Sequence, residues 1–133
     1  ALSRIFWDMH YYQTAYNILK DCADRKLNRD EIIQVNSMLA QYYKISQNSA
    51  QSEESWKIAA EQGDPFSCIE LAKIMEHKHK DVPAALAWSL QCKKILENDP
   101  KAQINAIFRK ETEKRIARLM VKGDRDVSSK DQR

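Results

Sequence analysis

The residues best suited to metal chemistry are two histidines near the middle of the chain, His77 and His79, which flank Lys78 and follow Glu76. Imidazole and carboxylate groups are common zinc ligands. On a helix, however, residues two apart point to different sides, so this pair cannot chelate one ion as an i, i+4 pair would. The histidines also stand near a predicted helix end, where basic side chains favour the dipole. We therefore interpret the segment as a helix-ending polar cluster and predict no metal site.

The remaining candidates for catalysis are equally isolated. His10 stands beside tyrosines without a serine or cysteine nucleophile in a recognisable motif. The acidic pairs Asp30–Glu31 and Glu53–Glu54 fall in or near first helical turns, where carboxylates counter the helix dipole. No glycine-rich phosphate loop is present. The sequence predicts no catalytic residue and no cofactor, and a small helical hydrolase is the disfavoured alternative.

The three cysteines, Cys22, Cys68 and Cys92, are widely spaced and odd in number. They form neither a disulfide framework nor a metal pattern. Each falls among apolar residues, which is typical of small core side chains in a reducing compartment. We expect a cytoplasmic protein.

The elements that carry these residues are predicted to be helices throughout. Apolar residues recur with helical spacing, and the chain has only two glycines and three prolines. Gly63 and Gly123 are expected to end helices, and no apolar run approaches the roughly 20 residues of a membrane span. The chain starts without methionine inside an apolar pattern, which suggests a piece of a larger protein. The prediction is an all-α fold of about seven helices.

A shift of 32 residues aligns the chain with itself, placing Leu39 on Leu71, Ala40 on Ala72 and Trp56 on Trp88. Such self-similarity resembles tetratricopeptide-like helical hairpins, which stack antiparallel in a right-handed superhelix. We expect this repeat domain to span residues 1–123. Its predicted parts are hairpins at about 2–25, 29–62 and 65–97, a capping helix at 100–122 and a polar, disordered tail at 124–133.

Two segments resemble known families. The segment Trp56–Asp64, followed by Leu71–Ala72, is similar to a Sel1-type repeat, but lacks the glycine-rich turn of that family. The segments Leu71–Lys73, Glu76–Lys78, Asp81, Ala84–Trp88 and Arg115–Leu119 resemble the C-terminal helical region of bacterial YprB-like proteins. In that family a ribonuclease-H-like, exonuclease-like domain precedes the helices. The resemblance implies an accessory domain without the acidic catalytic motifs.

The charge is strongly uneven along the chain. Residues 1–100 carry a net charge of −2 and residues 101–133 a net charge of +5. A basic stripe can contact phosphate groups, although a solvated capping helix explains it without a ligand. Glu111 can pair with Arg115, whereas Lys114 and Arg118 are expected to repel each other and leave positive charge unanswered. The possible nucleic-acid contacts are Arg109, Lys110, Lys114, Arg115, Arg118 and Lys122.

Tyrosines supply the candidate protein-binding surface. Tyr11, Tyr12, Tyr42 and Tyr43 could anchor a partner, although helical spacing makes core packing the default for most of them. The sequence therefore favours a non-catalytic interaction module that holds a protein, a peptide or the attached nuclease-like domain. The alternative is a nucleic-acid-binding helper that uses the basic C-terminal helix. The oligomeric state is left open.

Overall fold

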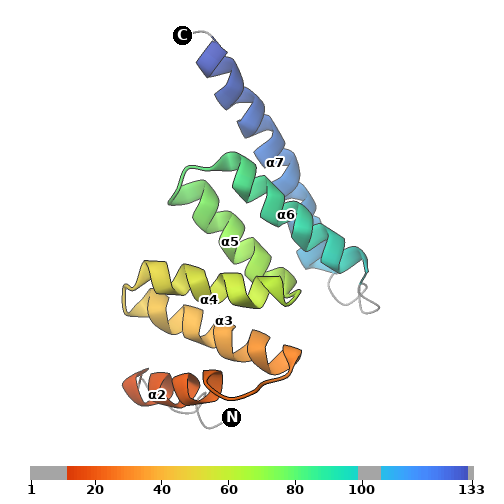
Figure 1. Cartoon of the computed structure of the whole chain (residues 1–133). Helices are drawn as coiled ribbons and strands as arrows, with labels where there is room; N and C mark the ends of the chain where they lie inside the picture. The colour runs from red at the N-terminus through yellow and green to blue at the C-terminus, as the bar shows by residue number, and fades with distance from the viewer. Residues whose placement is uncertain (1–11, 99–105, 132–133) are drawn as a thin grey trace. The chain divides into compact units, whose positions relative to one another are not determined.

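The structure is a computed structural model that describes residues 12–98 and 106–131 (Figure 1). Over these ranges the chain is helical and has no strand, which confirms the all-α prediction. The first part of the predicted hairpin at about 2–25, as far as Tyr11, and the predicted start of the capping helix at residue 100 lie outside the described residues. None of the described helices combines the length and apolar character needed to cross a membrane. The described helices are α2 (Tyr12–Ala23), α3 (Arg29–Ile45), α4 (Ser49–Glu61), α5 (Pro65–His77), α6 (Val82–Glu97) and α7 (Ala106–Asp131).

The chain divides into two compact units, an N-terminal unit of residues Ala1–Gln62 and a C-terminal unit of residues Gly63–Arg133. In the N-terminal unit, α3 packs against both α2 and α4. In the C-terminal unit, α6 packs against both α5 and α7 (Figure 1). Among the described residues, each unit therefore shows one helical hairpin and one further helix packed against it.

Local side-chain chemistry explains where three helices begin. Asp64 accepts a hydrogen bond from the main chain of Ser67 at 3.1 Å, with proline at the first position of α5. Asp81 caps α6 in the same way through the main-chain nitrogen of Ala84 at 3.0 Å. Asn28 and Glu31 form a reciprocal capping box at the start of α3. The sequence placed Glu31 in a first helical turn, but its reciprocal hydrogen bonds with Asn28 were not predicted.

Small residues let the hairpin helices approach closely. Ala40 of α3 and Ala72 of α5, which the 32-residue shift aligns, are both fully buried. Leu39 and Leu71 are buried beside them. Within the N-terminal unit the hydroxyl of Ser52 also donates to the Ala40 carbonyl at 2.7 Å, which ties α4 to α3. The aligned Leu and Ala positions therefore have the same burial in both hairpins, whereas Trp56 is buried and its counterpart Trp88 is half-buried.

The end of α4 is set by Gly63, whose φ of 95° lies in the left-handed region that favours glycine. The prediction that Gly123 ends the last helix was wrong. Gly123 does not have a positive φ, and α7 continues to Asp131 through most of the segment predicted to be a disordered tail. A glycine inside a formed helix costs only about 1 kcal/mol, so the helix can continue through it.

Candidate functional site

The basic residues of α7 converge on one acidic side chain of α5, Glu76, within the C-terminal unit. Arg118 forms a bidentate pair with the Glu76 carboxylate, at 2.5 and 2.8 Å. Lys122 donates to the same carboxylate at 3.0 Å, and the Arg115 guanidinium lies 3.9 Å from it. Arg115 and Arg118 are three residues apart, and Arg118 and Lys122 are four apart, so all three share one face of α7. We call Glu76, Arg115, Arg118 and Lys122 the Glu76 cluster.

Glu76 is almost completely buried, with 1% of its surface exposed. The hydrogen bond from Arg118 is the main reason that its pKa falls from the ordinary 4.5 to about 2. Burial acts in the opposite direction, and Lys122 adds to the lowering. The pKa of Arg118 is raised by the same pair. The carboxylate is therefore ionised at neutral pH and holds α7 against the hairpin of α5 and α6.

The other predicted nucleic-acid contacts are exposed or half-buried on α7. Arg109 lies 3.8 Å from Glu113, and Lys114 lies 3.9 Å from Glu111. Lys110 is exposed. The expectation that the charge of Arg118 is unanswered was wrong, because Arg118 pairs with Glu76. This glutamate lies on another helix, 42 residues earlier in the chain. Glu111 was predicted to pair with Arg115, but in the described residues it lies near Lys114, three residues after it in the chain.

The two histidines lie at the C-terminal end of α5, where His77 is the last helical residue and His79 follows it. His77 is exposed, and its Nε2 lies 3.5 Å from Glu76 Oε1. Among the residues that the structure describes, no group of three or more histidine, cysteine, aspartate or glutamate side chains is arranged to hold a metal ion. The interpretation as a polar helix end holds for His77 but was wrong for Glu76, whose carboxylate is the buried centre of an ion cluster.

Two of the three cysteines are fully buried in the C-terminal unit, and all three are free thiols. Burial raises the pKa of the Cys68 thiol to about 12 and also raises the pKa of Cys92. The Cys92 sulfur lies 3.6 Å from the Thr112 hydroxyl, which links α6 to α7. Protonated, inaccessible thiols are poor nucleophiles, so both residues act as core side chains.

Of the predicted tyrosine anchors, Tyr42 and Tyr43 lie in the described part of the chain, where they pack against each other and against Tyr16. Tyr11 and the side chain of Tyr12 lie outside the described residues. Tyr43 is buried, and its hydroxyl donates to that of Tyr16 at 3.3 Å. The rings of Tyr16 and Tyr42 stack at 4.5 Å between centroids. Burial, helped by Tyr16, raises the pKa of Tyr43 to about 12. Most of the Tyr43 surface is therefore buried by contacts within the N-terminal unit.

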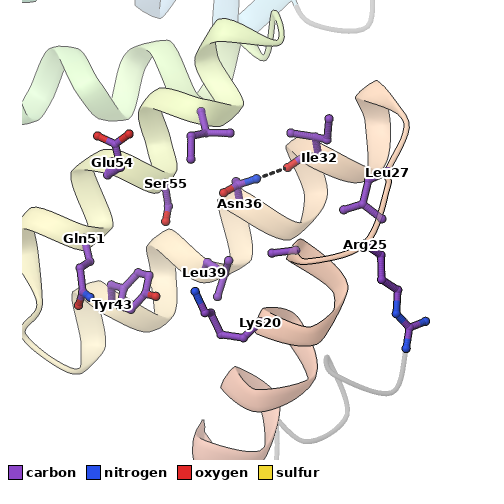
Figure 2. A pocket seen from close by; sticks show the side chains of 12 residues that line it. Lys20, Arg25, Leu27, Ile32, Asn36, Leu39, Tyr43, Gln51, Glu54 and Ser55 are labelled. Atoms are coloured by element: carbon purple, nitrogen blue, oxygen red, sulfur yellow. Dashed lines mark hydrogen bonds between the residues drawn. The ribbon is translucent and has the colours of Figure 1, made fainter.

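The N-terminal unit has an open groove of about 440 Å³, which local sequence patterns did not reveal (Figure 2). Its floor is one face of α3, at positions spaced three or four residues apart, and its walls come from α4 on one side and the end of α2 with the following loop on the other. The lining combines five aliphatic residues with seven that carry polar or charged groups. The floor residues are Ile32, Asn36, Leu39 and Tyr43; the walls are Lys20, Ala23, Arg25, Leu27, Gln51, Glu54, Ser55 and Ile58.

Polar groups at the base of this groove are largely buried. Asn36 is 9% exposed, and its amide nitrogen donates to the Ile32 carbonyl at 2.9 Å. The amide oxygen of Asn36 therefore faces away from Ile32, toward the α4 side of the groove (Figure 2). Ser55 lies on that side and is 6% exposed. The groove thus combines an apolar floor with an amide and a hydroxyl group.

Neither a family model, nor a curated protein, nor a solved structure matches this chain.

Proposed function

We propose that this chain is a non-catalytic interaction module that binds a protein or peptide segment in the groove of its N-terminal unit. The observation that carries this proposal is the groove itself, about 440 Å³ of open space on three packed helices. This volume is within the range of ligand-binding sites, and the lining combines five aliphatic residues with seven that carry polar or charged groups, which can orient a bound segment. Helices fix the lining residues more firmly than loops do.

The repeat supports a tetratricopeptide-like arrangement as part of the proposal. Leu39 and Ala40 in one hairpin have buried counterparts, Leu71 and Ala72, in the other. Repeats of this kind commonly use stacked hairpins as a binding surface. The sequence resemblance to the helical region of YprB-like proteins supports a further proposal, that the module serves a ribonuclease-H-like domain in the cytoplasm of a bacterium.

Selection from a displayed library of random peptides tests the proposed function. The full chain is the bait, and an unrelated helical protein of similar charge is the control. We expect enriched peptides that bind the chain saturably, with micromolar Kd in fluorescence anisotropy. The absence of peptides enriched over the control protein contradicts the proposal.

The second candidate function is nucleic-acid binding through α7. Its support is the charge of the Glu76 cluster, where three cations surround a single carboxylate. Arg118 and Lys122 are 50% and 41% exposed, so both can also reach an external phosphate. Titration with single- and double-stranded DNA and RNA at two salt concentrations tests this function, because phosphate contacts make affinity fall with salt. An affinity that does not change when Lys114, Arg115 and Arg118 are replaced by acidic residues contradicts this function.

A further inference from the structure

The length of the groove sets the size of the segment that it can hold. Its floor runs from Ile32 to Tyr43 along α3, which corresponds to about 16 Å at the helical rise. An extended chain covers the same distance with about five residues.

The polar groups on the floor and wall favour an extended segment over a helix. Among the described residues no donor bonds the Asn36 amide oxygen and the Ser55 hydroxyl has no partner, and because no buried polar side-chain atom there lacks a partner, both atoms are accessible to solvent. Both side chains are more than nine-tenths buried. A helical ligand has already satisfied its main-chain N–H groups, whereas an extended segment needs acceptors for them. Asn36 and Ser55 can supply these acceptors.

The charges on the walls set the chemistry of the segment. Lys20 on α2 has no ion-pair partner among the described residues, whereas Arg25 beside it already pairs with Asp21 at 2.6 Å. Glu54 stands on the opposite wall and likewise lacks a partner in the described part of the chain. An acidic side chain is therefore favoured near α2 and disfavoured near α4.

We propose that the groove binds an extended, apolar peptide segment whose main chain donates to the Asn36 amide oxygen and whose acidic side chain pairs with Lys20. This inference rests on the proposed peptide-binding function and adds to it the conformation and charge of the partner. Apolar side chains of the segment would cover Leu27, Ile32 and Ile58.

The test uses the peptides selected against the full chain, of about ten residues each. We expect Lys20→Glu to weaken their binding at least about fivefold, because it turns an attraction into a repulsion. Changing the acidic residue of the peptide to lysine should restore binding to this variant, as expected for a direct contact in a double-mutant cycle. Asn36→Leu, which removes the acceptor at similar volume, should weaken binding about tenfold.

Lys57→Glu is the matched control, because Lys57 is an exposed lysine of α4 outside the groove lining. Lys20 is also exposed, so its substitution leaves the core intact. Peptides that bind Lys20→Glu, Asn36→Leu and Lys57→Glu alike would overturn the inference while leaving the interaction module standing. If no peptide binds the unaltered chain, the proposed function fails and the inference fails with it.

Discussion

At the scale of single residues, Glu76 makes the clearest contribution to stability. Its buried carboxylate accepts hydrogen bonds from Arg118 and Lys122, and these cations remain partly in contact with water. Glu76→Gln keeps the shape but removes the charge, so we expect the free energy of unfolding to fall by about 2 kcal/mol. The cations can hydrate in the variant, which limits the loss. Urea denaturation at neutral pH measures it.

Glu70→Gln is the control for this substitution. Glu70 also lies on α5, and it pairs with Lys73 three residues later at 3.2 Å. Local pairs between partly exposed residues contribute little, so the control should change the free energy of unfolding by less than about 0.5 kcal/mol. Equal losses in the two variants would contradict a special role for Glu76.

The pH dependence of stability follows from the same carboxylate. The folded protein holds the pKa of Glu76 at about 2, below the ordinary value of 4.5. A group whose pKa is lowered by folding stabilises the protein above its unfolded pKa, and this stabilisation is lost as pH falls through the folded pKa. We expect the stability advantage of the unaltered chain over Glu76→Gln to be complete near neutral pH and to shrink from about pH 4.5 toward about pH 2.

Urea midpoints of both proteins across this pH range measure that difference. Other carboxylates titrate in both chains and cancel in the comparison. A constant difference between the two proteins over the whole range would show that Glu76 is not held ionised by the fold.

The sequence could not reveal the role of Glu76. Its neighbours His77 and Lys78 made it look like part of a polar helix end, which is correct for His77. Its partner Arg118 is 42 residues away, and a pairing over that distance leaves no local pattern. Burial of Tyr43 could be expected from helical spacing, but its hydroxyl contact with Tyr16 depends on how α2 and α3 pack.

At the scale of elements, α7 differs most from expectation. Gly123 lies inside this helix, and a Cβ added to it would stand 3.7 Å from the Val82 Cγ1 atom, an ordinary van der Waals distance. We therefore expect Gly123→Ala to raise the free energy of unfolding by up to about 1 kcal/mol, because alanine has the higher helix propensity. Urea denaturation measures the change. A clear loss of stability would instead indicate that the position needs a conformation that only glycine adopts.

Helix limits were predictable where side-chain type alone decides them. Asp64 and Asp81 stand just before apolar helical patterns, and each caps the helix that follows. Gly63 ends α4 because its backbone takes a positive φ. Gly123 has the same residue type but a helical backbone, and only the structure separates the two cases. The all-α class was therefore predictable, whereas the length of the last helix was not.

At the scale of the whole chain, the 32-residue repeat indicated that the aligned Leu and Ala residues are buried in both hairpins, but it did not predict that Trp88 is more exposed than Trp56. The groove of the N-terminal unit was not predictable, because it depends on how far apart α2 and α4 stand on α3. Lys20, Asn36 and Glu54 are ordinary helical residues in the sequence, and they become a possible binding site only when three helices bring them together. Similarly, the net charge of the C-terminal region could be counted, but its partial neutralisation by Glu76 could not.

That neutralisation leads to a prediction about nucleic-acid binding. If α7 contacts phosphates, Glu76 competes with them for Arg118 and Lys122. Glu76→Gln should then raise the affinity for a single-stranded oligonucleotide at low salt by more than Glu70→Gln, although both variants gain one unit of net charge. The salt dependence should also steepen in Glu76→Gln, because more phosphates are neutralised by the freed cations. Equal affinities in the two variants would show that the Glu76 cluster serves only to hold α7 in place.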